Sequence, residues 1–236
     1  MLAKRWLIST FLISLVVFLV CTLPAALLVG SLPPVHLAGQ PLQFSAAQGS
    51  VWNGKASLAW KQLSGTLSWQ LDWREGYPGV AFRTLGAVPS SGWAAASAET
   101  LLVRELDVSL SAPMLRQFQP DLQLGGTILA KSVSFTFRDK HITDASGSLA
   151  YTGGDAKWRR DDAVVVPPLR GVIKQQPLGP EVVIEDDAST MMATAKIDNN
   201  IGALTVYRAW AVRLGLSQGG SADDVVFETS LPLWPE

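Results

Sequence analysis

Beyond residue 55, apolar side chains recur at every second position, and this alternation constrains the fold more than any other feature of the sequence. It is clearest at Leu67, Trp69, Leu71 and Trp73. The same pattern occurs in four shorter runs, at residues 56–60, 106–110, 133–137 and 225–227. Successive side chains of a strand point to opposite faces of a sheet, so a period of two is typical of strands with one buried face. Because Gly, Asp, Asn and Ser separate the runs at hairpin-like spacings, we predict a mainly β domain, built as an antiparallel sheet or sandwich.

Two segments depart from this alternation. Residues 113–119 predict a short helix, with Ser111 as its cap and Pro120 at its end. Residues 205–215 fit a helix and a late strand equally well. The predicted helical content of the β-rich part is therefore small.

The N-terminal segment has a different character. Lys4 and Arg5 precede an apolar run at residues 6–29, and no further charged residue occurs before Lys55. About 20 apolar residues suffice for a helix to cross a bilayer. Cations at one end of such a helix favour the orientation that places this end in the cytoplasm. We therefore predict a cytoplasmic N-terminus at residues 1–5, a single transmembrane helix at residues 6–29 and an exported remainder.

Two alternatives exist for this segment. A cleaved signal peptide has an apolar region of only about 7–15 residues before its cleavage site, and residues 24–30 offer poor cleavage sites. A lipoprotein site at Cys21 is disfavoured because Val20 stands where a small residue is usual. A retained anchor is the favoured interpretation. Since Cys21 is the only cysteine, disulfides within the exported part are excluded.

Prolines mark the boundary between the apolar run and the β-rich domain. Pro33, Pro34 and Pro41 are incompatible with a continuing helix and predict an extended connector at residues 30–41. The periplasmic β-rich domain is then expected at residues 42–236.

A glycine-initiated strand pair occurs twice in the sequence. Residues 49–60 (GSVWNGKASLAW) align without a gap to residues 126–137 (GTILAKSVSFTF), and residues 63–69 match residues 145–151 after five extra residues in the second copy. The two copies share four identities, Gly49/Gly126, Ser57/Ser134, Ser64/Ser146 and Gly65/Gly147. Strand patterns also resemble one another by chance. Chance similarity therefore explains the match as well as duplication of a strand unit does, and duplication is a hypothesis.

The charged and nucleophilic residues do not form a recognisable catalytic pattern. The formal net charge is −1, and without Lys4 and Arg5 the chain has 17 basic against 20 acidic residues. Without a basic cluster, a nucleic-acid partner has no support. The only histidines are His36, in the connector, and His141, in a charged turn at residues 138–144, and no Gly-x-Ser-x-Gly motif is present. We predict no enzyme activity, no catalytic residue and no cofactor.

Acidic residues cluster in three places, at residues 161–162, 185–187 and 223–224. Adjacent acids on a strand point to opposite faces, so they do not form an acid/base pair by themselves. Asp186, Asp187, Asp198 and Asn199 are candidate calcium ligands, but they lack the spacing of a calcium loop. We therefore predict no metal site.

The nine tryptophans suggest stacking on sugars as one possible function. Trp60, Trp69 and Trp73 occupy alternating strand positions, which is more typical of a core or a sheet face. Trp52 and Trp93 lie in less regular contexts and are our candidates for exposed interaction residues.

The layout also carries a resemblance to a known family. A short basic N-terminus, one apolar span and a proline-containing connector are followed by residues 49–56 (GSVWNGKA) and 65–71 (GTLSWQL). This arrangement resembles protein N of the bacterial type II secretion system. The resemblance implies a single-pass protein of the Gram-negative inner membrane with a periplasmic domain. It would be an accessory structural component that supports export of folded proteins across the outer membrane through protein contacts. Its partners would be other subunits, either the inner-membrane platform alone or also the secretin.

The chain is also similar to the AsmA-like membrane-anchored proteins, whose β-rich periplasmic domains suggest a sheet with an apolar concave face. That similarity implies an alternative function, a periplasmic envelope protein that binds lipid or glycan. The alternative requires an apolar sheet face wider than a packed core needs.

Overall fold

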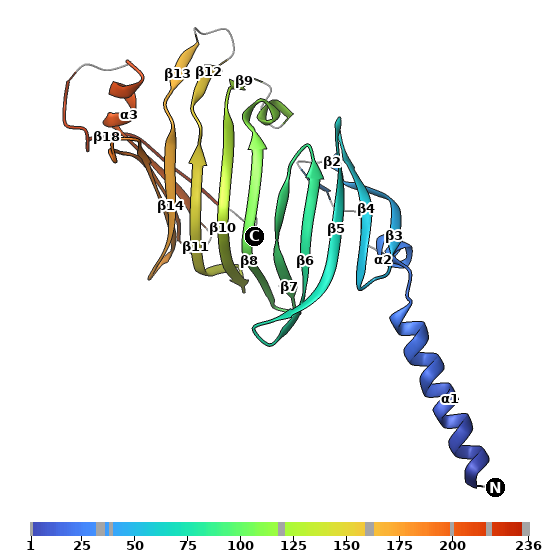
Figure 1. Cartoon of the computed structure of the whole chain (residues 1–236). Coiled ribbons are helices and arrows are strands. Elements are labelled where there is room, and N and C mark those ends of the chain that lie inside the picture. Colours follow the sequence, from blue (N-terminus) through green and yellow to red (C-terminus); the bar gives the residue numbers. More distant parts are fainter. Residues whose placement is uncertain are drawn as a thin grey trace. The chain divides into compact units, whose positions relative to one another are not determined.

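The computed structural model describes residues 2–31, 36–37, 40–117, 121–158, 163–198, 201–215 and 219–232 (Figure 1). The chain divides into two compact units, unit 1 at Met1–Ala87 and unit 2 at Val88–Glu236. Both units consist mainly of antiparallel strands, which confirms the predicted mainly β fold.

Unit 1 begins with two helices. Helix α1 spans Leu2–Cys21 and helix α2 spans Ala25–Ser31, so the predicted membrane segment falls on both. Pro24 lies between them, and a proline ends a helix because it has no N–H and clashes with the preceding turn. None of the helices in the described part of the chain combines the length and the apolarity needed to cross a membrane.

The sheet of unit 1 contains four strands in the order β3-β4-β5-β6. They span Gln43–Gly49 (β3), Asn53–Trp60 (β4), Leu63–Arg74 (β5) and Tyr77–Gly86 (β6). Two short strands, β1 (His36–Leu37) and β2 (Gln40–Pro41), pair with each other in the predicted connector. Of that connector, residues 30–31 belong to α2, and residues 32–35 and 38–39 lie outside the described residues.

The core of unit 1 lies between α2 and one face of this sheet. Ala25 of α2 packs against Ala56 and Trp69, and all three are buried. Val29 and Leu67 border the same cluster. The alternation therefore supplies a buried face at Ala56 and Trp69, whereas Leu71 and Trp73, later in β5, are exposed.

The main sheet of unit 2 contains nine strands in the order β7-β8-β10-β11-β14-β15-β16-β17-β18. They span Ser90–Ala96 (β7), Thr100–Ser111 (β8), Thr127–Arg138 (β10), His141–Tyr151 (β11), Leu169–Gln176 (β14), Gly179–Asp186 (β15), Met191–Asp198 (β16), Ile201–Tyr207 (β17) and Val225–Pro232 (β18). Asp139 and Lys140 join β10 to β11 with φ angles of 50° and 66°. Positive φ at both central residues is the geometry of a tight hairpin turn, which confirms the predicted turn beside His141.

Smaller elements lie beside the main sheet of unit 2. A three-stranded sheet has the order β13-β12-β9, from Val164–Val166 (β13), Gly154–Trp158 (β12) and Leu122–Leu124 (β9). The predicted short helix is present as the 3₁₀ helix η1, Ala112–Gln117, and residues 118–120 lie outside the described residues. The ambiguous segment 205–215 contains both alternatives, because β17 ends at Tyr207 and helix α3 spans Arg208–Arg213.

The two copies of the hypothetical repeat form the hairpins β4–β5 and β10–β11. Gly49 and Gly126 have φ angles of 88° and 78°, a conformation that glycine adopts at low cost. The strand registers differ, because β10 and β11 pair with shifts between Lys131 and Thr136, whereas β4 and β5 pair without one. Duplication stays a hypothesis.

Candidate functional site

An apolar surface crosses the main sheet of unit 2. Residues paired across neighbouring strands place their side chains on the same face. One continuous row of paired positions consists of Val108, Ala130, Leu149, Gly171, Ile184, Ala193, Val206 and Phe227. A second row consists of Gly147, Ile173, Val182, Ala195 and Leu204. We call these two rows the apolar face.

Part of the apolar face is covered by the smaller elements of unit 2. Ala112 of η1, Tyr151 of β11 and Val166 of β13 form a buried cluster. Trp210 of α3 and Ala156 of β12 pack against it. Figure 1 shows η1, β9, β12 and α3 near the same end of the strands of the main sheet. These elements therefore form a cover over that end of the apolar face.

Between the cover and the sheet lies a cavity of about 380 Å³ that is broadly open to solvent. Leu149, Gly171 and Ile184 contribute its floor, and Leu124, Ala156 and Trp210 contribute from the cover. The exposed lining is almost wholly apolar. An apolar cavity of this size lies within the range of ligand pockets, about 300–1,000 Å³.

Two residues with polar side chains line the cavity, Arg170 and Tyr151. Arg170 follows Leu169 and precedes Gly171 on β14, so its side chain points to the opposite face of the sheet. Tyr151 is buried, and its hydroxyl donates a hydrogen bond to Gly125 O at 2.9 Å. Burial, together with the nearby charge of Asp155, raises the pKa of Tyr151 above its usual value of 10.0. The hydroxyl therefore stays neutral at physiological pH and is engaged within the chain.

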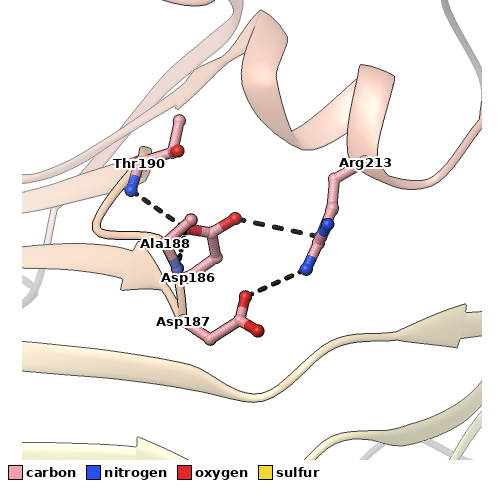
Figure 2. Close-up of polar contacts among 5 residues, drawn as sticks. All are labelled: Asp186, Asp187, Ala188, Thr190 and Arg213. Atoms are coloured by element: carbon pink, nitrogen blue, oxygen red, sulfur yellow. Dashed lines mark hydrogen bonds and ion pairs between the residues drawn. The ribbon is translucent and has the colours of Figure 1, made fainter.

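Helix α3, which carries Trp210, is attached to the turn after β15 by ionic contacts (Figure 2). Arg213 Nη2 lies 2.9 Å from Asp187 Oδ1, and Arg213 Nε lies 3.8 Å from Asp186 Oδ2. Asp186 Oδ1 also accepts the N–H groups of Ala188 and Thr190, each at 2.9 Å. Asp186 thus closes the turn and Asp187 holds the helix, so these acids have structural roles.

The structure gives no support to the calcium alternative. In the parts of the chain that are described, no three His, Cys, Asp or Glu residues gather in a way that would hold a metal ion. Asn199, one of the considered ligands, lies outside these residues.

The two tryptophans predicted to be exposed are both engaged within the chain. Trp93 has an exposed fraction of 0%, so the expectation that it is exposed is wrong. The reason is the pairing of β7 with β8, which places Trp93 and Ala95 on a buried side of the sheet. Trp52 is half-buried, and its Nε1 donates to Val20 O of α1 at 2.8 Å. An interaction role for Trp52 stays a prediction.

Strand β18 offers a second candidate surface. It pairs with β17 on one side, and no other described strand lies beside its outer edge. Val225, Phe227 and Leu231 are each more than half exposed. The strand contains no Lys or Arg, and its only proline is the last residue, Pro232. It therefore lacks the cations and internal prolines with which proteins commonly protect sheet edges.

The AsmA-like alternative predicts an apolar sheet face, but the sequence places neither the cavity nor the outer edge of β18. The alternation at Leu149 and Tyr151, and at Leu169, Gly171 and Ile173, was available as a signal. It shows which side chains share a face of one strand. It does not show which strands become neighbours or which segment covers them.

A model of the family described as type II secretion system (T2SS), protein N matches residues 40–214. No curated protein and no solved structure matches the chain. The similarity to AsmA-like proteins stays a prediction.

Proposed function

The chain belongs to the protein N family of the type II secretion system, and we propose that it acts in the inner membrane as an accessory structural component of that system. In this role it supports export of folded proteins across the outer membrane through protein contacts in the periplasm. The family is one of secretion components and is not known as an enzyme family.

The observation that carries this proposal is the outer edge of β18, beside which no other strand of the described residues lies. An edge strand presents unpaired N–H and C=O groups, and an extended segment of another protein can pair with them as an added strand. The exposed side chains of Val225 and Phe227 supply apolar contacts beside those hydrogen bonds. The proposed partners are other subunits of the system, either the inner-membrane platform alone or also the secretin.

The proposed membrane location rests on the N-terminal segment. Helix α1 exposes large apolar side chains from Phe11 to Val20, and Lys4 and Arg5 precede them. A lipid environment would remove this surface from water, and the two cations favour a cytoplasmic N-terminus. We expect the protein to stay in the membrane fraction after alkaline extraction, with the mass of the uncleaved chain. Release into the soluble fraction would count against this location.

The functional test combines a deletion with an edge variant. Deleting the protein should lower export of folded exoproteins or reduce the levels of other inner-membrane subunits. Phe227→Lys should reproduce the defect, because it places a cation on the proposed docking edge. Val172→Lys is the matched control, since Val172 is also exposed but lies on β14, between β11 and β15. Normal secretion and normal subunit levels in the deletion strain would contradict the proposal.

The partner is identified by crosslinking in intact cells. A photoreactive amino acid at position 227 should capture a secretion subunit, whereas the same amino acid at position 172 should not. Capture of the same proteins from both positions would show that the edge is not the docking surface.

A further inference from the structure

We propose that the cavity beneath α3 binds one acyl chain of a membrane phospholipid. This is a ligand site in addition to the proposed role in secretion. The choice of a phospholipid rests on the proposed membrane location, whereas the choice of a hydrocarbon chain rests on the cavity alone.

The chemistry of the walls selects the ligand. The lining is almost wholly apolar, and the hydroxyl of Tyr151 is already bonded to Gly125 O. A sugar, nucleotide or peptide in this cavity would lose its hydration without gaining hydrogen bonds in return, which is costly. A hydrocarbon chain loses no hydrogen bond on entry. The cavity therefore discriminates against glycans and in favour of lipids.

The size of the cavity also points to an occupant. The cavity is broadly open, so its apolar lining faces solvent. Its volume of about 380 Å³ lies within the range of ligand pockets. A hydrocarbon chain that covers this lining removes apolar surface from water, which is favourable.

The apolar face gives the rest of a lipid a place to lie. The cavity is broadly open, and Gly171 in its floor lies two positions before Ile173 on the same face of β14. In the second row, Ile173 and Val182 are half-buried and Leu204 is exposed. A chain longer than the cavity can follow this surface while its headgroup remains in water.

The test uses the full chain in nanodiscs that contain phosphatidylethanolamine with a photoreactive diazirine in one acyl chain. After illumination, adducts are mapped by mass spectrometry. We expect adducts on peptides that contain Leu149, Ile184 or Trp210, in addition to those that membrane contact produces on α1. Adducts on α1 alone would overturn the proposal.

Matched variants separate the cavity from the rest of the sheet. Ile184→Phe fills the floor and should abolish labelling of the Leu149 peptide, with labelling of α1 unchanged. Val183→Phe is the control, because Val183 is the preceding residue of β15 and points to the opposite face. Ala156→Leu fills the cavity from the cover. It replaces Ile184→Phe in the test if circular dichroism shows that Ile184→Phe does not fold. Unchanged labelling in the folded filling variants would overturn the proposal.

A parallel arm with free photoreactive palmitate identifies the source of the chain. Labelling of the cavity by palmitate but not by the phospholipid would contradict the assignment to a phospholipid. The secretion assay tests the lipid site and the proposed function independently. A cavity-filling variant that loses labelling but still supports export would show that lipid binding and export are separate properties.

Discussion

Gly54 lies directly against the indole ring of Trp69. The two residues pair across β4 and β5, and a Cβ atom at Gly54 would lie 2.5 Å from Trp69 Cζ2. It would also lie 2.9 Å from the backbone oxygens of Gln48 and Ser50. Trp69 is fixed in place because its Nε1 donates to Val51 O at 3.0 Å. Gly54, the second glycine of residues 49–60, therefore has a structural role, because it leaves room for the buried side chain of Trp69.

Gly54→Ala should destabilise unit 1. Neither the backbone oxygens nor the buried indole can move away freely, so we expect a loss of about 1–3 kcal/mol in the free energy of unfolding, as for other overpacked cores. Gly30→Ala is the control, because a Cβ there meets nothing within 4 Å and alanine favours a helix. The measurement is urea denaturation followed by tryptophan fluorescence. Equal midpoints for Gly54→Ala and the native chain would refute the close packing.

Tyr151→Phe should lower stability through a lost hydrogen bond. The variant keeps the ring but removes the hydroxyl donor to Gly125 O, and the loss of this partly buried hydrogen bond should cost about 0.5–1.5 kcal/mol. The measurement is again the unfolding midpoint. A midpoint equal to that of the native chain would mean that water replaces the hydroxyl as a donor.

The same tyrosine predicts a pH dependence. Its pKa is raised in the folded chain, so between pH 10 and the folded pKa the unfolded chain binds fewer protons than the folded one. The contribution of Tyr151 to the free energy of unfolding is therefore fully present below pH 10.0. It is lost as the pH rises through the pKa of the folded chain. Native chain and Tyr151→Phe should differ in the slope of unfolding free energy against pH above 10, with the native chain steeper. Parallel slopes would contradict the raised pKa.

The sequence predicts the local structure of this chain better than its surfaces. Alternation at Leu67 and Trp69 predicts β5 because strand geometry is a local property. The burial of Trp93 was predicted wrongly, because burial depends on which strand pairs with β7. The cavity was not predictable for the same reason: Gly171 and Trp210 meet only after β17 has joined the sheet and α3 has folded over it. Burial and the cavity depend on which distant strands pair, and the local sequence pattern does not determine that pairing.

Asp186 and Asp187 should differ in importance although they are adjacent. The side chain of Asp186 is only 4% exposed and accepts two backbone N–H groups, whereas that of Asp187 is 59% exposed. Asp186→Ala removes a buried carboxylate that accepts two partly buried N–H groups and should cost about 1–3 kcal/mol. Asp187→Ala removes an exposed ion pair and should cost less than about 1 kcal/mol. Thermal unfolding of the two variants checks this order, and equal costs would refute it.

Arg213→Ala should make the cover over the cavity easier to open. The ion pair with Asp187 is exposed, and such pairs contribute about 0.2–1 kcal/mol. Its loss should accelerate exchange of a photoreactive phospholipid by up to about fivefold, as that energy implies. Lys196→Ala is the control, since it removes a comparable ion pair with Glu181 at 3.0 Å, between β16 and β15. In a double-mutant cycle, Arg213→Ala and Asp187→Ala together should accelerate exchange no more than Arg213→Ala alone, because Arg213→Ala already removes the contact with Asp187 as well as the longer one with Asp186. Additive effects, or equal acceleration by Lys196→Ala, would show that this pair does not hold the cover.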